Sequence, residues 1–298
     1  MQGRAASAAR PSRAEAVAPV AFVLLWSTGF VVARYATRDA GPLTFLAVRM
    51  VLAAGLLAAI ALVIRAPRPT AEQVRWAAIA GVGLHALYLG GVFVAIDRGM
   101  PAGVSALISG LHPVVTSLLA VRVLGERLTR RQWIGVGLGF TGVVVVVIDR
   151  LMAHSQGITV FALVASAISI AGMSAGTLVQ RRHGAATPLV WGTVAQFTAS
   201  AVVFWVLVLV WEGVQFDVTA RTSFAMAWSV LVMSIAAILM MLWLLQRQAA
   251  ARVSSLFFLT PALSALEAAI LFGERLGGLA LVGLVVGLAG VALVTRSR

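Results

Sequence analysis

Long apolar runs alternate with short polar gaps along almost the whole chain. The runs are about 18–22 residues long, which is enough for a helix to cross a bilayer. We predict ten transmembrane helices, at about 17–36, 43–64, 74–96, 101–121, 132–148, 157–178, 189–210, 224–245, 252–272 and 277–295. Isolated strands cannot satisfy their backbone hydrogen-bonding groups in lipid. The alternating runs of about ten residues that are typical of a membrane β-barrel are absent from the sequence. The prediction is an all-α integral membrane protein.

Composition supports this assignment. Hydrophobic residues make up 61% of the chain and charged residues 11%, whereas soluble domains carry about 25% charged residues.

The first 16 residues, MQGRAASAARPSRAEA, are basic and small. No A-x-A cleavage site follows a short apolar core, so the first run is predicted to be a retained helix and not a signal peptide. Residues 1–16 are therefore predicted to be a cytoplasmic tail.

Two stretches of the chain, residues 108–147 and 257–294, repeat one another. At an offset of 148, Pro113 aligns with Pro261 and Gly-Glu-Arg-Leu 125–128 with 273–276, and three glycines of each copy then coincide without a gap. The sequence therefore predicts two repeats of five helices, 17–150 and 151–298. Because five is odd, the second repeat must be inverted in the membrane, which is typical of a secondary transporter.

The arginines are distributed unequally between the two sets of gaps. One set holds 16 of them: Arg4, Arg10, Arg13, Arg65, Arg68, Arg75, Arg122, Arg127, Arg130, Arg131, Arg181, Arg182, Arg247, Arg252, Arg296 and Arg298. The other set holds six: Arg34, Arg38, Arg98, Arg150, Arg221 and Arg275. The positive-inside rule predicts cytoplasmic termini.

A net charge of +13 is also found in nucleic-acid-binding proteins. In this sequence the arginines lie between the apolar runs, so their role in membrane topology explains the positive charge. No nucleic-acid partner is expected.

The order of the motifs resembles a known family. Leu25-Trp26 and Arg34 come first, then Phe45-Leu-Ala-Val-Arg49, His85-Ala-Leu-Tyr88-Leu-Gly-Gly, and Gly103-Val-Ser-Ala-Leu, before the duplicated Pro…Gly-Glu-Arg-Leu…Gly-x-x-x-Gly-x-x-Gly signature. Together they resemble the EamA-type branch of the drug/metabolite transporter superfamily over essentially the whole chain. The resemblance implies a ten-helix carrier of the bacterial inner membrane, typically an exporter of amino acids, other metabolites or toxic compounds.

Several polar or aromatic residues are predicted to face a substrate cavity. His85 and Tyr88 lie three residues apart, hence on one helix face, and in lipid a polar face turns inward. The other candidates are Trp26, His112, Gln180 and Trp243. A buried histidine with satisfied hydrogen bonds is the structural alternative. With no Cys, no His-x-x-His pair and no carboxylate cluster in the sequence, neither a metal site nor a cofactor is expected.

Two charged residues fall inside predicted spans, Glu267 and Arg49. A charge at a helix centre costs about 2.5–3.5 kcal/mol on insertion scales, so each is expected to face the protein interior. For Glu267 the choice lies between a functional site, for proton coupling or for binding a substrate amine, and a protonated or paired structural carboxyl near a helix end. The resemblance implies a structural or gating role for Arg49. Its alternatives are substrate contact and a side chain that fixes topology, and the two residues are also candidates to pair with one another.

The duplicated prolines, Pro113 and Pro261, each remove a backbone donor and bend a helix. Broken helices flank the substrate in inverted-repeat carriers, so both are candidate gating kinks. The Gly-x-x-x-Gly runs allow close helix approach, either between the two halves or at a dimer seam. The protein is thus predicted to be a monomer or homodimer in membrane lipid.

The leading functional hypothesis is a secondary exporter of small molecules that works by alternating access. Its alternatives are a facilitative carrier or uniporter, and a scramblase-like lipid carrier of the same fold. An enzyme is not expected, because the chain contains no G-x-S-x-G, HExxH, paired-carboxylate or Walker motif. A passive channel lacks support as well, since no carbonyl-rich filter or charged ring is recognisable in the sequence.

Overall fold

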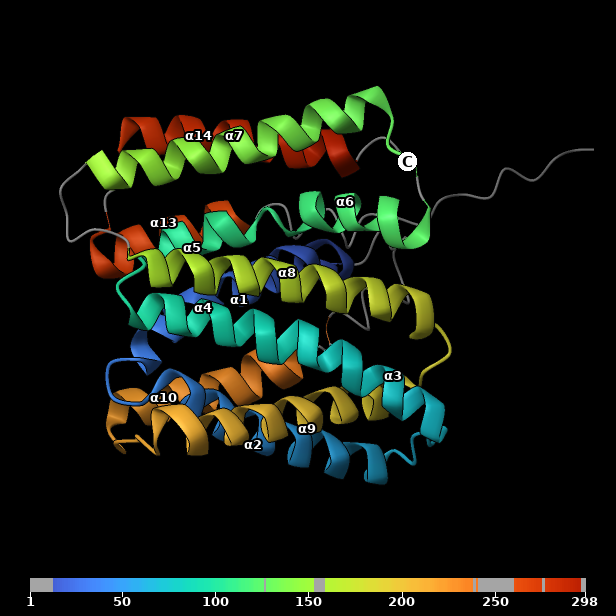
Figure 1. Ribbon diagram of the computed structural model, residues 1–298. Helices are drawn as coiled ribbons and strands as arrows, with labels where there is room; N and C mark the ends of the chain where they lie inside the picture. Colours follow the sequence, from blue (N-terminus) through green and yellow to red (C-terminus); the bar gives the residue numbers. More distant parts are fainter. Residues whose placement is uncertain are drawn as a thin grey trace, which may run out of the picture.

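The structure is a computed structural model, and it describes residues 13–125, 127–152, 159–237, 240, 260–274 and 277–295. Within these ranges the secondary structure is helical, apart from one isolated bridge between Ala40 and Phe216. The helices lie side by side along a common direction (Figure 1). The predicted all-α class is confirmed.

The first half of the chain forms five helical rods. Their elements are α1 (Arg13–Ala36), α2 (Pro42–Val63), α3 (Ala71–Gly81) continuing through the π-helical η1 (Val82–Leu87) into α4 (Tyr88–Asp97), the broken pair α5 (Ala102–Ser109) and α6 (His112–Leu124), and α7 (Arg130–Met152). Local signals explain several boundaries. Thr70 and Gln73 form a capping box ahead of α3, Pro42 occupies the first turn of α2, and Gly125 ends α6 in the left-handed conformation with φ of 67°.

The second half repeats this arrangement. Its elements are α8 (Val160–His183), α9 (Leu189–Leu207) with the π-helical η2 (Val208–Glu212), α10 (Ala220–Ala227) with the π-helical η3 (Trp228–Ala236), α13 (Thr260–Phe272) and α14 (Gly278–Thr295). Five of the described rods are both long and apolar enough to span a bilayer: Pro42–Val63, Ala71–Asp97, Ala102–Val123, Val160–His183 and Leu189–Glu212.

Two of the observed helices differ clearly from the predicted spans. The span predicted at 157–178 begins at Val160 and continues to His183, because the polar residues of its last turn remain helical. The span predicted at 101–121 is two helices, α5 and α6, separated at Gly110 and Leu111. Most of residues 238–259, which the predicted spans 224–245 and 252–272 include, lie outside the described residues.

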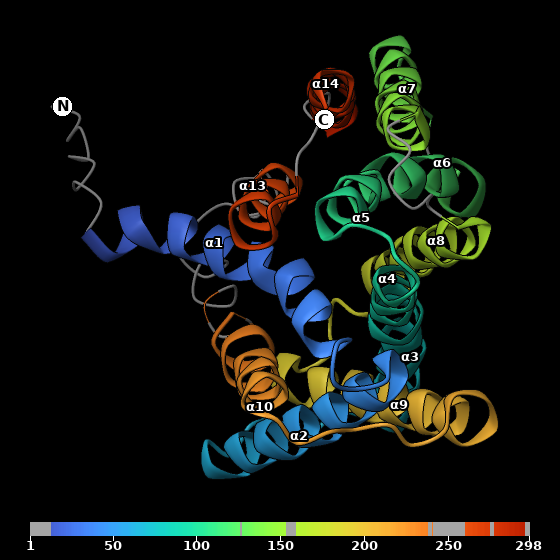
Figure 2. The ribbon, with the colours of Figure 1, turned by 90° about the vertical axis from the view of Figure 1, so that its left-hand side faces the viewer.

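Equivalent helices of the two repeats run in opposite directions. In α7 and α14, Gly142 packs on the backbone of Gly283 and Gly287, whereas Gly139 packs on Gly290. The order along one helix is thus reversed along the other. Helices α2 and α9 are also antiparallel, since Thr44 at the start of α2 contacts Glu212, while Ala66, just beyond its end, contacts Trp191. The end-on view shows α7 and α14 together at the periphery, with α2, α9 and α10 on the opposite side (Figure 2).

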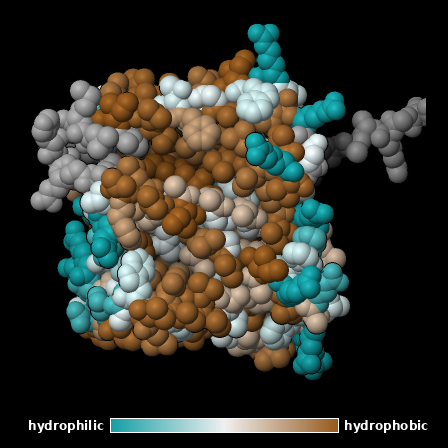
Figure 3. Space-filling model, in the orientation of Figure 1, coloured by the Kyte–Doolittle hydropathy of each residue, from teal (hydrophilic) through white to brown (hydrophobic). Residues whose placement is uncertain are grey.

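The surface has a broad apolar band with hydrophilic residues gathered at its two ends (Figure 3). We call one end the acidic end. It carries Asp39, Asp97, Glu212, Asp217 and Glu274, in the turns that join α1 to α2, α4 to α5, η2 to α10 and α13 to α14. The opposite end is the basic end, whose described arginines are Arg65, Arg68, Arg75, Arg122, Arg127, Arg130, Arg131, Arg181 and Arg182. An apolar band between two polar ends is the surface of an integral membrane protein.

Candidate functional site

A cavity of about 270 Å³ lies among α1, α2, η1, α4, α8, α9 and η3. Of the residues predicted from the sequence, the structure brings five to its wall: Trp26, Arg49, His85, Tyr88 and Gln180. They come from four separate rods, three in the first repeat and one, α8, in the second. The cavity extends from the middle of the bundle toward the basic end, where the wall includes residues near the end of α8 and the start of α9.

Two π-helical segments at repeat-equivalent places contribute to this wall. Segment η1 supplies His85, and segment η3 supplies Met233 and Ser234. In η3 the Ser234 hydroxyl donates to the carbonyl of Ser229, five residues earlier, at 2.9 Å. A π-helical turn widens the backbone and shifts the side chains that follow it, and such turns often occur at functional sites.

A chain of neutral hydrogen bonds connects three helices on one side of the cavity. His85 Nε2 lies 3.1 Å from Gln196 Oε1, and Gln196 Nε2 donates to Gln180 Oε1 at 3.1 Å. The imidazole also meets the edge of Phe197, with 4.8 Å between ring centroids. His85 is therefore held in place by neutral groups, and Gln196 joins the predicted Gln180 in the same network.

Arg49 lies on the other side of the cavity and does not pair with Glu267. Its Nε and Nη2 atoms both lie 3.3 Å from the hydroxyl oxygen of Ser234. The side chain is buried, with 6% of the residue exposed. Its hydrogen-bond partner is a neutral hydroxyl.

His112, Pro113 and Pro261 line a smaller side pocket of about 40 Å³, which shares Trp26 and Tyr88 with the main cavity. Pro113 cannot donate to the carbonyl of Ser109. His112 follows the helix break directly, and its carbonyl accepts a hydrogen bond of 3.2 Å from the Ser174 hydroxyl on α8.

Gly110, in the same break, packs against Pro261. An added Cβ at this glycine would lie 2.7 Å from Cγ of the proline. The helix break of the first repeat therefore packs against Pro261 of the second repeat, and both prolines line the side pocket. Residues 241–259, which precede α13, lie outside the described ranges.

Glu267 is not part of the cavity wall. It lies on α13 against α1, where Ser27 Oγ is 2.5 Å from its Oε1. Ser264 on the same helix donates to the carbonyl of Ser27 at 2.8 Å. The carboxyl thus joins the two repeats beside the cavity. Trp243, the remaining predicted cavity residue, lies outside the described residues.

Glu274 joins α13 to two elements of the first repeat at the acidic end. Its carboxylate forms an ion pair with Arg34 on α1 and accepts hydrogen bonds of 3.0 Å from the backbone N–H groups of Ala102 and Gly103. An anion at the first turn of a helix is stabilised by the helix dipole and by unpaired N–H groups. The Glu274 side chain is 8% exposed and that of Arg34 is 30% exposed. We call this contact the Glu274 bridge.

Glu212 makes a second contact of this kind. Its carboxylate accepts from the backbone N–H groups of Leu43 and Thr44, at 2.9 and 2.7 Å. Gly41 is needed beside it, because an added Cβ there would collide with the glutamate side chain. The sequence pattern indicates neither Glu274 nor Glu212, because both carboxylates cap helices that are distant in the sequence.

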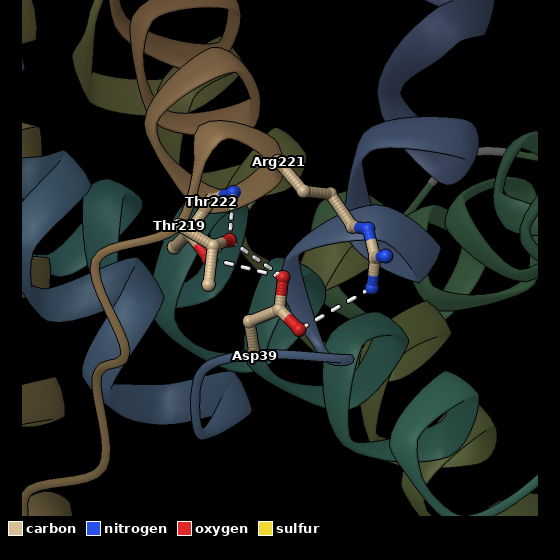
Figure 4. Close-up of polar contacts among 4 residues, drawn as sticks. All are labelled: Asp39, Thr219, Arg221 and Thr222. Carbon is tan, nitrogen blue, oxygen red and sulfur yellow. Dashed lines mark hydrogen bonds and ion pairs between the residues drawn. The ribbon is translucent and has the colours of Figure 1, made fainter.

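A wider opening of about 670 Å³ lies at the acidic end, with Asp39, Asp97 and Glu212 among its charged residues. At its edge Asp39 accepts from the Thr219 hydroxyl at 2.7 Å and from Arg221 Nη1 at 3.3 Å (Figure 4).

An aromatic stack separates this opening from the central cavity. Phe93, in the cavity wall, stacks on the fully buried Phe45 at 5.8 Å, and Phe45 stacks on Phe216, in the wall of the opening, at 6.5 Å.

The model of the EamA-like transporter family matches residues 15–148 and again residues 157–296. A "Probable amino-acid metabolite efflux pump" of Escherichia coli (strain K12) is 26% identical over 291 residues, covering 94% of each chain. The "Uncharacterized inner membrane transporter YedA" of the same strain is 24% identical, over 93% of this chain and 89% of its own. One crystal structure matches with a TM-score of 0.64 at 20% identity, covering 95% of this chain and 96% of its own, and supports the fold alone.

The two matches to the family model cover nearly the whole chain and agree with the duplicated signature, the antiparallel equivalent helices and the central cavity. The chain is a membrane transporter, not an enzyme, and it belongs to the EamA-like transporter family within the drug/metabolite transporter superfamily.

Proposed function

We propose that this transporter is a secondary exporter, which carries small metabolites such as amino acids, or toxic compounds, from the cytoplasm by alternating access. The observation that carries the proposal is the central cavity between inverted repeats, which extends toward the basic end. At the acidic end the aromatic stack and the Glu274 bridge join the repeats. The arginine asymmetry favours a cytoplasmic basic end with both chain termini on that side. Substrate would then enter this conformation from the cytoplasm.

The broken helices supply the moving parts of the proposed cycle. The break at Gly110 and Leu111 and the contact of Gly110 with Pro261 lie beside the cavity. Bending at Pro113 and Pro261 would let α5 and α13 part at the acidic end while the basic end closes. A cavity of about 270 Å³ suits one small metabolite better than a phospholipid, so we favour the exporter over a scramblase-like carrier.

Glu267 is the proposed coupling residue, and the geometry around it fits a protonated carboxyl. Ser27 has one hydroxyl proton, yet its Oγ lies 2.9 Å from the carbonyl of Leu24 as well as 2.5 Å from Glu267 Oε1. A neutral Glu267 would donate to Ser27, which would in turn donate to Leu24. Loss of that proton would turn the Ser27 hydroxyl from the carbonyl of Leu24 to the carboxylate and would leave a charge between α13 and α1, and so connect protonation to movement between the repeats.

We expect Glu267→Gln to abolish net export driven by a pH gradient but to retain substrate exchange, because glutamine mimics the protonated side chain permanently. The measurement is uptake and counterflow in proteoliposomes, with and without an imposed pH gradient. A panel of amino acids, purines, quaternary ammonium compounds and organic anions would be supplied. The matched control is Glu72→Gln, which removes an exposed carboxylate at the start of α3.

Wild-type transport and pH dependence in the Glu267→Gln variant would mean that Glu267 is structural. The protein would then be a facilitative carrier or would be coupled elsewhere. If no member of the panel undergoes saturable counterflow with the wild-type protein, the exporter proposal itself fails.

A further inference from the structure

The central cavity contains a buried cation that has no acidic partner. Arg49 contributes its guanidinium to the wall, and the hydrogen bonds from its Nε and Nη2 go to the neutral Ser234 hydroxyl, at 3.3 Å each. Within the described part of the chain, Arg49 forms no ion pair with a carboxylate. A buried charge is costly unless an opposite charge or several hydrogen bonds compensate for it.

Carboxylates are missing from the cavity wall as described. No Asp or Glu occurs among its lining residues, and Glu267 is directed at Ser27 instead. Residues 238–259, most of which lie outside the described ranges, contain no Asp or Glu in the sequence. The cavity is therefore electropositive. An ammonium group that bound there would lose its hydrating water molecules, and no carboxylate in the wall would compensate for that loss.

The remainder of the wall is apolar or neutral. On the side of His85, the glutamine chain of Gln196 and Gln180 presents uncharged donors and acceptors. Much of the remaining surface comes from aromatic and thioether side chains, namely Trp26, Phe30, Phe93, Phe197, Met173 and Met233. Such a wall suits a hydrocarbon or aromatic body attached to a single charged group.

We propose that the cavity selects small organic anions, whose carboxylate pairs with Arg49 and whose apolar body lies against the aromatic wall. This inference rests on the proposed function and narrows its substrate class, because it excludes the zwitterionic amino acids that the proposed function includes. A carboxylate accepts two parallel hydrogen bonds from a guanidinium, and this is the strongest pairing available to Arg49. A zwitterion would bring an ammonium group without a partner, and a cation would be repelled by Arg49. An exported anion would also gain from a membrane potential that is negative inside.

The test is a set of four ligands that share one body and differ in charge: 3-phenylpropanoate, phenylalanine, phenylalaninamide and 3-phenylpropanamide. Binding would be measured by titration calorimetry on the purified wild-type protein, and transport by uptake into proteoliposomes. We expect 3-phenylpropanoate to bind at least about tenfold more tightly than the other three, because it alone is an anion without an ammonium group. Equal or tighter binding of phenylalanine or phenylalaninamide would overturn the inference.

Arg49→Lys and Arg49→Gln test the assigned residue, with Arg68→Gln as a matched control that removes an exposed arginine at the basic end. We expect Arg49→Gln to lose about tenfold or more in affinity for 3-phenylpropanoate and to leave 3-phenylpropanamide unchanged, with Arg49→Lys intermediate. Elution as a single species in size-exclusion chromatography verifies folding.

A loss of affinity that is equal for the anion and the amide would contradict the assignment of Arg49. The ligand series in the wild-type protein does not depend on either variant. Robust transport of phenylalanine without preference for the anion would refute the substrate class and leave the exporter intact.

Discussion

Glu274→Gln is expected to shift the transporter strongly toward the conformation that is open at the acidic end. Glutamine keeps the size of the side chain but loses the ion pair with Arg34, and its amide group faces two N–H donors of α5. Removing one partner of a buried pair costs about 3–5 kcal/mol, and the lower limit applies here because the Arg34 side chain is 30% exposed. Each 1.4 kcal/mol is a factor of ten, so the ratio of closed to open states should fall by a factor on the order of 100. Net export should fall with it, because the cycle must return through the closed state.

The control for this prediction is Asp39→Asn. Asp39 also holds an arginine at the acidic end, but the Arg221 side chain is 44% exposed, and exposed pairs contribute about 0–1 kcal/mol. Export rates of the two variants would be compared in proteoliposomes. Equal rates for Glu274→Gln and the wild-type protein would mean that the Glu274 bridge does not hold the acidic end closed.

Gly142→Leu is expected to separate α7 from α14 and to destabilise the whole protein. A Cβ at Gly142 would collide with the backbone of Gly287 and Gly283. Backbone cannot move aside as a flexible side chain does, and overpacking of this kind costs about 1–3 kcal/mol or more. The apparent melting temperature in detergent should fall by roughly 5–10 °C, and the yield of monodisperse protein should fall as well.

Gly137→Leu is the matched control on the same helix, because Gly137 is exposed and an added Cβ would meet nothing within 4 Å. It should leave the melting temperature close to that of the wild-type protein. If both variants have the same melting temperature as the wild-type protein, the close packing of α7 on α14 does not stabilise the fold.

The features that were predictable from the sequence are those that a repeated or periodic pattern encodes. Gly142 aligns with Gly290 at an offset of 148, so the sequence divides into two repeats of equal length. Because each repeat has an odd number of helices, the second repeat must be inverted in the membrane. The antiparallel glycine contacts of α7 and α14 agree with that reasoning. Pro113 likewise marks the break between α5 and α6, because proline removes a backbone donor wherever it occurs.

The contacts that close the acidic end were not predictable, because each joins residues that are far apart in the chain. Nothing local to Glu274 indicates that it caps α5, and nothing local to Glu212 indicates that it caps α2. Nothing in the sequence around His85 or Ser234 indicates the π-helical turns that contain them. For Glu267, burial in a span indicated an inward side chain, but its rotation toward Ser27 and away from the cavity depends on how α13 meets α1.

The central claim is that one cavity is exposed alternately to the two ends, and a single introduced cysteine tests it most directly. The chain contains no Cys, so Thr193→Cys, in the cavity wall on α9, would be the only thiol available to a membrane-impermeant reagent. Arg68→Cys and Val218→Cys, at exposed positions of the basic and acidic ends, serve as references for the two sides. Without substrate, we expect Thr193→Cys to be labelled from the side that labels Arg68→Cys. With a transported substrate present, we expect labelling also from the side that labels Val218→Cys. Labelling from one side only under every condition would contradict alternating access.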